Sequence, residues 1–217
     1  MLELALVVGF GALAIRSAKI REDELSSIPR RLSDKLGRLW DIAHQGMRDN
    51  RFIRAEKALL TILKIDQKNA AAYNRLGILY AKQKEYRDAI DCFEIASSVE
   101  ATPSSLHNLG LIYYETENYE KAAVAFEQAL KLEDDLAARH VAYAKVQEKL
   151  GNHKIMLQEL ERAVELEPNH ETFALLKKAY EDLGLHDEAK AIEQRAKKMI
   201  ITSGKRRRMH RPRRVVI

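Results

Sequence analysis

The chain has 217 residues, 46% of them hydrophobic and 32% charged, and a formal net charge of +5 at pH 7. Its nine glycines and four prolines are too few for many long loops, which excludes a loop-rich architecture. Its single cysteine, Cys92, excludes an internal disulfide and a zinc site built from several thiolates, and it favours a reducing compartment.

The first element in the chain is an apolar run. Residues 4–15 read LALVVGFGALAI and are followed by the cations Arg16 and Lys19. A helix over residues 2–20 would be about 28 Å long, close to the thickness of a bilayer core. The cations after the run could reach the lipid interface. We therefore predict a single membrane-anchor helix over residues 1–20, with the rest of the chain on the cytoplasmic side.

Two other interpretations of the apolar run remain open. The ALA at 12–14 resembles a cleavage site, so the run could be a signal peptide, although Glu3 offsets the positive start that such peptides need. A cleaved chain would be a secreted or periplasmic protein. The run could also be a packed helix of a soluble protein. Residues 21–35, which contain Pro29 and many charges, are expected to form a charged linker.

Between residues 36 and 203 one pattern recurs at a period of about 34 residues. The small or apolar residue of each expected second helix recurs at spacings of 34, 33, 34 and 33, at Ala55, Ala89, Ala122, Met156 and Ala189. Four residues further on, the chain has Leu59, Phe93, Phe126, Leu160 and Glu193. Residues three, four and seven apart share one face of a helix, and this period is typical of helix–turn–helix repeats. One pair of helices cannot bury its apolar face alone, so we predict an all-α stack of about five pairs.

Two of the units match one motif best. In the unit 103–136 it consists of Leu106, Leu109, Gly110, Tyr113, Ala122, Phe126 and Ala129, and in the unit 70–102 of Tyr73, Leu76, Gly77, Tyr80, Ala89, Phe93 and Ala96. This motif resembles the tetratricopeptide repeat family. The resemblance covers about three-quarters of the chain, in units at about 36–69, 70–102, 103–136, 137–169 and 170–203. It implies a right-handed superhelical solenoid, and the order of segments resembles membrane-anchored bacterial members with cytoplasmic repeats.

The last unit differs from the others at one packing position. Glu193 stands where the other units have leucine or phenylalanine. A further repeat would bury this charge, which is costly without a partner. We therefore expect the pair 170–203 to be a cap with a polar outer face.

The resemblance also implies where a partner would bind. In the family, the first helices line a concave groove, and the second, fifth, ninth and twelfth positions of each repeat face the ligand. On this chain we expect the groove to contain Trp40, His44, Met47, Asn74, Ile78, His107, Leu111, Tyr114, Val141, Lys145 and Lys178. Trp40 and Tyr114 are rigid aromatic groups of the kind that anchor interfaces, unless they only cover neighbouring helices. Asn74 and His107 can hydrogen-bond a peptide.

Residues 204–217 are expected to form a disordered basic tail, because they have no apolar period. Residues 205–214 read KRRRMHRPRR, and without their seven positive charges the chain would carry −2. The tail is expected to meet an anionic surface through Lys205, Arg206, Arg207, Arg208, Arg211, Arg213 and Arg214. That surface is either anionic lipid, at about 1 kcal/mol for each basic group, or RNA. The alternative is a tail that only keeps the protein soluble.

The sequence contains no catalytic motif. Its seven histidines are scattered over different repeats without the His–Glu–x–x–His spacing of a zinc helix, and there is no phosphate loop or nucleophile elbow. We expect neither an enzyme nor a cofactor, metal or small-molecule substrate. The sequence predicts a non-enzymatic, membrane-tethered scaffold whose cytoplasmic groove binds a peptide or helix of a partner protein. The alternatives are a nucleic-acid- or ribosome-associated factor that uses the basic tail, and a secreted or periplasmic repeat protein.

Overall fold

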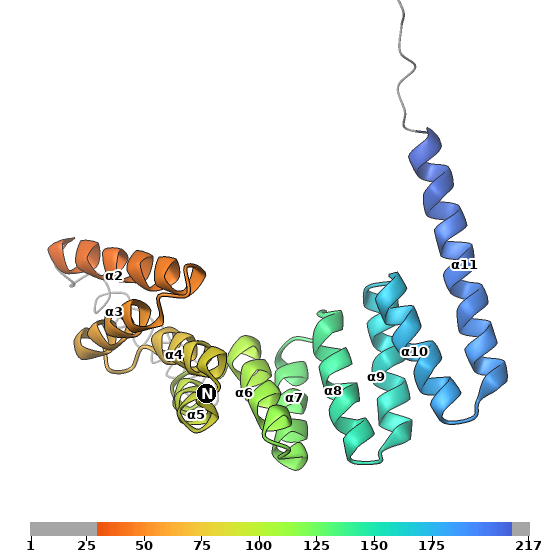
Figure 1. Ribbon diagram of the computed structural model, residues 1–217, viewed down its shortest axis with the longest axis horizontal. Coiled ribbons are helices and arrows are strands. Elements are labelled where there is room, and N and C mark those ends of the chain that lie inside the picture. The colour runs from red at the N-terminus through yellow and green to blue at the C-terminus, as the bar shows by residue number, and fades with distance from the viewer. Residues whose placement is uncertain (1–29, 210–217) are drawn as a thin grey trace, which may run out of the picture. The chain divides into compact units, whose positions relative to one another are not determined.

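The computed structural model describes residues 30–209, with side chains described for residues 32–199. The predicted anchor (1–20), the start of the linker and residues 210–217 of the tail lie outside the described residues. The described helices are α2 (Arg30–Arg48), α3 (Phe52–Ile65), α4 (Ala70–Gln83), α5 (Tyr86–Val99), α6 (Pro103–Glu115), α7 (Tyr119–Leu132), α8 (Ala137–Lys149), α9 (His153–Leu166), α10 (His170–Asp182) and α11 (His186–Met209) (Figure 1). None of these helices is both long and apolar enough to cross a bilayer.

The chain divides into two compact units, Met1–Lys68 and Asn69–Ile217. In the first unit α2 and α3 pack against each other as one helix pair. A Cβ atom at Gly46 would lie 3.0 Å from the backbone nitrogen of Ala55, so the glycine allows the two helices to approach closely. The buried side chains of this pair are Ala43, Met47, Ala55, Ala58, Leu59 and Ile62.

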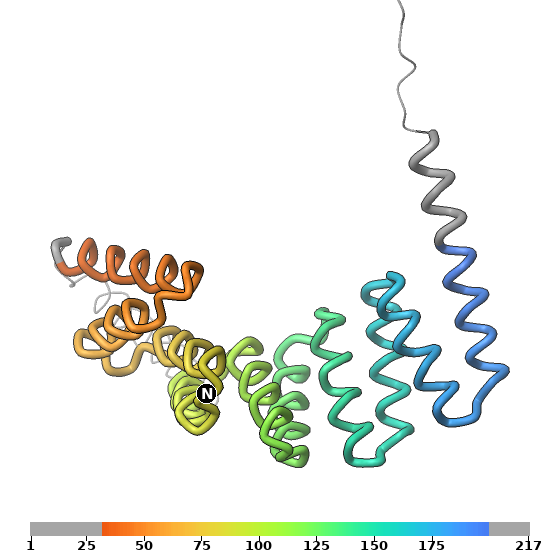
Figure 2. Tube along the Cα trace, in the orientation of Figure 1, coloured from red at the N-terminus to blue at the C-terminus, as the bar shows by residue number. Residues whose placement is uncertain are grey.

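The second unit contains four helix pairs, α4–α5, α6–α7, α8–α9 and α10–α11, which follow one another as a stack (Figure 2). The second helix of each pair contacts the first helix of the next pair: α5 packs on α6, α7 on α8 and α9 on α10. The first helices α4, α6 and α8 also touch in that order. The predicted all-α solenoid of helix–turn–helix repeats is therefore confirmed.

A phenylalanine packs directly on a glycine in two of the pairs. A Cβ atom at Gly77 would lie 2.7 Å from the ring of Phe93, and one at Gly110 would lie 2.9 Å from the ring of Phe126. Both rings are buried, with 1% and 0% of their surface exposed. Full burial of such a ring stabilises the fold by about 1.5–3 kcal/mol. The glycine and the phenylalanine of the repeated motif thus form one contact between the two helices of a pair.

The tyrosine of the motif joins one pair to the preceding pair. The Tyr180 hydroxyl in α10 donates a hydrogen bond to Glu161 of α9 at 2.5 Å, and the Tyr113 hydroxyl in α6 donates to Glu94 of α5. Burial raises the pKa of Tyr180 to about 12, and Glu161 contributes to that shift. The Tyr180 hydroxyl therefore stays protonated at neutral pH and remains a donor.

Polar side chains determine where several first helices begin. Thr102 accepts a hydrogen bond from the backbone N–H of Ser105, and the Ser105 hydroxyl accepts one from the N–H of Thr102, which forms a capping box. Asn169 and Thr172 make the same reciprocal arrangement at the start of α10. Such caps contribute about 1 kcal/mol each. They hold the first turns of α6 and α10, which border the concavity described below.

The last pair has the partly polar surface expected of a cap. Glu193 of α11 is half-buried and forms ion pairs with Lys177 of α10 at 3.4 Å and with Lys197 at 2.6 Å. Its carboxylate is therefore paired at the surface of the α10–α11 pair.

The first residues of the predicted disordered tail are helical in the structure. Helix α11 continues to Met209, so residues 204–209, which we expected to be disordered, are helical. Lys, Arg and Met have high helix propensity. Extending a helix that the repeat has already nucleated also avoids the cost of starting a new one.

Candidate functional site

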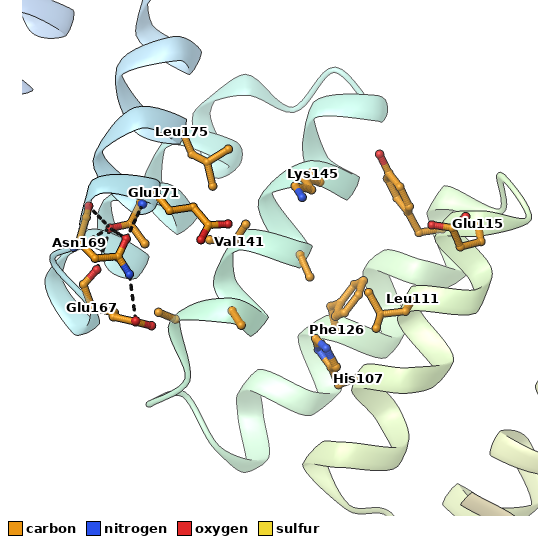
Figure 3. Close-up of a pocket in the computed structure, with 15 residues that line it drawn as sticks. His107, Leu111, Glu115, Phe126, Val141, Lys145, Glu167, Asn169, Glu171 and Leu175 are labelled. Atoms are coloured by element: carbon orange, nitrogen blue, oxygen red, sulfur yellow. Dashed lines mark hydrogen bonds between the residues drawn. The ribbon is translucent and has the colours of Figure 1, made fainter. Parts of the chain in front are cut away.

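Three first helices, α6, α8 and α10, line a concavity in the second unit (Figure 3). Its volume is about 370 Å³, and its walls include His107, Leu111, Tyr114, Val141, Lys145 and Leu175. A second hollow of about 320 Å³ continues along the same helices and shares Tyr114, Val141, Lys145 and Leu175 with the first. We call the two hollows together the groove.

The centre of the groove is apolar but open to solvent. Leu111 is 38% exposed, and Val141, Leu175 and Tyr114 are half-buried. The Tyr114 ring is held edge-on against Tyr119, with the ring centroids 5.6 Å apart. The groove thus presents apolar surface at fixed positions on three rigid helices.

The charge of the groove changes along its length. Near the start of α10 the first hollow is lined by Glu167 and Glu171, whereas Glu115, the last residue of α6, and Lys145, its single ammonium group, line the other end. Figure 3 shows the Glu171 side chain extending from α10 toward Val141 on α8. The second hollow, nearer the helix ends, is lined by Lys145, Lys149 and Lys178 together with Glu148 and Asp182. One end of the groove is therefore acidic, and the other end carries charges of both signs.

His107 forms part of the wall of the first hollow and is neutral at pH 7. Burial lowers the pKa of His107, and the nearby charge of Arg139 lowers it further. The His107 ring stands edge-on to Phe126 with the ring centroids 5.4 Å apart. Its Nδ1 atom is buried and has no hydrogen-bond partner within the described protein. A neutral imidazole in this place can hydrogen-bond a ligand without adding a charge to the groove.

Two buried residues fix the start of α8, which has no side-chain cap. Arg139 donates to the carbonyl oxygen of Glu133 and forms an ion pair with its carboxylate at 3.0 Å. His140 binds Glu159 through Nδ1 at 2.6 Å and the Asp134 carbonyl through Nε2 at 2.9 Å. These contacts bind the Glu133 and Asp134 carbonyl groups of the preceding loop and so hold the first turn of α8 beside the groove.

The side chains that line the groove include several that can bind a ligand. Its walls offer apolar surface, an imidazole, ammonium groups and carboxylates. In the part of the chain that the structure describes, no three His, Cys, Asp or Glu side chains gather in a way that could hold a metal ion.

The groove brings together six of the predicted site residues, His107, Leu111, Tyr114, Val141, Lys145 and Lys178. Two others, Asn74 and Ile78, lie on α4 and are not among the residues that line it. Asn74 accepts a hydrogen bond from the amide of Asn108 at 3.1 Å, and Ile78 packs against the core around α5, α6 and α7.

The remaining predicted residues lie in other parts of the chain. Trp40 and His44 belong to the first unit, where their ring centroids are 5.7 Å apart. Met47 is buried, with 7% of its surface exposed, so it is a packing residue and not a ligand-facing one. Among the tail residues, Lys205, Arg206, Arg207 and Arg208 belong to the helical backbone of α11. Arg211, Arg213 and Arg214 lie outside the described residues.

The groove also contains residues that sequence reasoning did not single out. Glu171 and Ala138 occupy the second position of their repeats, which the family pattern names as ligand-facing, so this pattern could have found them. Leu175 and Glu167 occupy positions outside that pattern. Their contribution depends on how α10 packs against α8, which has no signal in the sequence.

Comparison with protein families and solved structures agrees with this architecture. Tetratricopeptide repeat models match residues 69–135 and 137–170. A structure of the MamA protein is 20% identical and has a TM-score of 0.70, with 85% of this chain and 98% of that chain covered. For MamA from Desulfovibrio magneticus RS-1 the identity is 14% and the TM-score 0.68, with 78% and 97% covered. YrrB, described as a TPR protein with an unusual peptide-binding site, is 20% identical with a TM-score of 0.62, and 71% and 80% are covered.

A search of curated protein sequences finds no match. The family models cover the pairs α4–α5, α6–α7 and α8–α9, which include two of the three helices that line the groove. The structural matches extend the same architecture over most of the chain. The chain therefore carries tetratricopeptide repeats within residues 69–170 and has the tetratricopeptide-repeat solenoid fold.

Proposed function

We propose that the protein is a non-enzymatic scaffold whose groove binds a peptide or helix of a partner protein. The observation that carries this proposal is the exposed apolar centre of the groove, formed by Leu111, Val141 and Leu175, with Tyr114 and charged groups around it. Protein-binding sites commonly combine an aromatic anchor, an apolar centre and a polar rim. YrrB, which shares the fold, has a peptide-binding site according to the description of its structure.

The dimensions of the groove suit a short segment of chain. Along α8 its walls run from Ala138 to Lys149, a distance of about 17 Å at the helical rise of 1.5 Å per residue. An extended peptide covers that length with about five residues. Alternate side chains of such a peptide would face the apolar centre, and the others would face the charged rim.

Truncation of the aromatic anchor tests this proposal. In Tyr114→Ala we expect capture of the native partner to fall about tenfold or more, because aromatic anchors contribute about 2 kcal/mol when they are central to an interface. Val124→Ala on α7 is the matched control, since Val124 is 54% exposed and does not line the groove. Both variants should keep the circular dichroism of the parent. Equal capture by the two variants would contradict the proposal.

We also propose that residues 1–20 tether the scaffold to a membrane with the repeats in the cytoplasm. The support for this is the apolar run at 4–15 with positive charge after it. We expect the protein to stay with membranes after a high-salt wash and to be released when residues 1–20 are deleted. Release by salt alone would point to the basic tail as the attachment, because interactions between basic residues and anionic lipid or RNA are screened by salt.

A further inference from the structure

Two buried polar atoms beside the groove lack a hydrogen-bond partner. They are Nδ1 of His107 on α6 and Nε of Arg139 on α8, and they are the two such side-chain atoms in the part of the chain that the structure describes. Buried polar groups are nearly always paired, so each of these atoms calls for an explanation. The charge of Arg139 lowers the pKa of His107, so the two side chains lie within electrostatic range of each other.

The path of the Arg139 side chain leads toward the helix pair that carries His107. Helices α6 and α8 are in contact, and the two residues stand near their starts, as the fifth residue of α6 and the third residue of α8. Arg139 is only 3% exposed. Its two terminal nitrogens bind Glu133, the residue that follows α7. The guanidinium group therefore lies against the α6–α7 pair.

Arg139 is a departure from the repeat. The third residue of the other first helices in the second unit is small, as in Ala72, Ser105 and Thr172. No requirement of the repeated packing explains a long, charged side chain at this buried position. A role specific to this repeat does explain it.

The two unpaired atoms have complementary hydrogen-bonding capacity. Nε of an arginine always carries a hydrogen and can only donate, whereas Nδ1 of a neutral imidazole accepts when the ring proton is on Nε2. With the proton on Nδ1, two N–H donors would be buried and unpaired, which is costly. If Nδ1 accepts from Arg139, directly or through one bridging water, a single interaction satisfies both atoms.

The preceding repeat contains a similar arrangement. Asn74 is the fifth residue of α4, the position that His107 has in α6, and its side-chain oxygen accepts a hydrogen bond from Asn108 of α6 at 3.1 Å. The side chain at this position of one repeat is therefore oriented by a donor from the first helix of the next repeat.

We infer that Arg139 holds the imidazole proton of His107 on Nε2, which makes His107 a fixed hydrogen-bond donor of the groove. Nε2 makes no hydrogen bond within the described protein and is not buried, so it opens onto the first hollow, whose wall contains the ring (Figure 3). Leu111 and Tyr114 lie one and two turns further along the same face of α6. Arg139 is thus a positioning residue, and His107 is the group that meets the ligand.

This donor specifies one feature of the ligand. The ligand must present an acceptor oxygen to His107, beside the apolar centre of the groove, because a donor placed there would find no partner on the ring. The backbone carbonyl groups of an extended peptide meet this requirement at any sequence. The inference therefore rests on the proposed peptide-binding function and adds how the groove recognises the peptide backbone.

NMR spectra of the imidazole nitrogens in the 15N-labelled full chain test the position of the proton. At pH 8 we expect a protonated Nε2 and an unprotonated Nδ1 in His107. The Nδ1 resonance should be displaced upfield from its position in the urea-unfolded chain, because it accepts a hydrogen bond. A proton on Nδ1, or an undisplaced Nδ1 resonance, would overturn the inference without recourse to any variant.

Two substitutions show whether Arg139 is the donor. Arg139→Met keeps the aliphatic part of the side chain and removes Nε, so the upfield displacement of His107 Nδ1 should be lost. Glu133→Gln is the matched control, because it removes the ion pair of Arg139 and leaves Nε in place. The same change in both variants would assign the effect to the ion pair and would overturn the inference.

A small acceptor molecule tests the donor that faces the hollow. The probe is N,N-dimethylacetamide, an amide that has a carbonyl oxygen and no N–H group, and its binding is followed by the methyl signals of Leu111 and Val141. We expect His107→Phe to weaken binding about fivefold, the effect of one hydrogen bond. His107→Gln should restore it, because the glutamine amide places an N–H group near the position of Nε2. Equal binding by the parent and His107→Phe, or no rescue by His107→Gln, would overturn the inference.

The results for His107 and for Tyr114 separate this inference from the proposed function. If Nδ1 of His107 carries the proton while Tyr114→Ala loses the native partner, the inference fails and the proposed function stands. If the spectra and the probe give the expected results while Tyr114→Ala captures the partner unchanged, the proposed function fails and the assignment of His107 as a donor stands.

Discussion

A single added methyl group at Gly110 tests the packing between the two helices of a pair. In Gly110→Ala the new Cβ atom would lie 2.9 Å from the Phe126 ring, whereas ordinary contacts begin at 3.4 Å. The Cβ atom and the ring must therefore move apart by about 0.5 Å. Phe126 is fully buried and cannot swing away. Overpacking of this kind costs about 1–3 kcal/mol, and the higher helix propensity of alanine offsets about 1 kcal/mol. We expect a net loss of about 1 kcal/mol.

Urea denaturation followed by circular dichroism measures this change. Gly37→Ala on α2 is the matched control, because its Cβ atom would meet nothing within 4 Å and should stabilise its helix by about 1 kcal/mol. In a Phe126→Leu background the smaller side chain leaves room, so Gly110→Ala should no longer destabilise the protein. The double mutant should therefore be more stable than the sum of the two single changes predicts. If Gly110→Ala stabilises the parent as much as Gly37→Ala does, the proposed contact is wrong.

Three further predictions concern side chains whose environment the fold changes. Burial opposes a charge on His140, but its hydrogen bonds to Glu159 and Asp134 outweigh burial and raise its pKa, whereas burial and Arg139 lower the pKa of His107. In an NMR titration the pKa of His140 should lie above about 6.5 and the pKa of His107 below it. Because the pKa of His140 is higher in the folded than in the unfolded protein, its contribution to stability should be fully present below the unfolded pKa and should be lost as the pH rises through the folded pKa. Burial, followed by the charges of Asp88 and Asp91, raises the pKa of Cys92 to about 12, so the thiol should react slowly with iodoacetamide at pH 8 and quickly in urea; equal rates would contradict the burial. Asn169→Ala should cost about 1 kcal/mol in urea denaturation because it removes the cap of α10, and a loss below a few tenths would count against the capping box.

The sequence predicts the stack well because a small number of contacts repeat in it. The glycine and phenylalanine that recur 33 residues apart, at Gly77, Gly110, Phe93 and Phe126, are the residues that touch in the structure. The periodicity also identified Glu193 as a surface position of the last pair. Since each repeat contacts only its neighbours, such local patterns are enough to define the architecture.

The groove was less predictable because it depends on departures from the repeat. Met47 stands at a ligand-facing position by pattern, yet it is buried. The acidic end of the groove arises from Glu167 in a connecting loop, together with Glu171, and loop residues have no fixed place in a helical period. His140 stands at the position where the two preceding units have Tyr73 and Leu106, and in the structure it pairs with Glu159 and with the Asp134 carbonyl of the preceding loop.

Site-specific photo-crosslinking in the native cell tests most directly whether the groove is the binding surface. A photoreactive amino acid is placed at Leu111, which is 38% exposed in the groove, and in a second chain at Val124, which is 54% exposed on α7 and outside the groove. We expect a discrete crosslinked product from position 111 that is absent from position 124. The same product from both positions, or a product from position 124 alone, would contradict the assignment of the groove as the binding site.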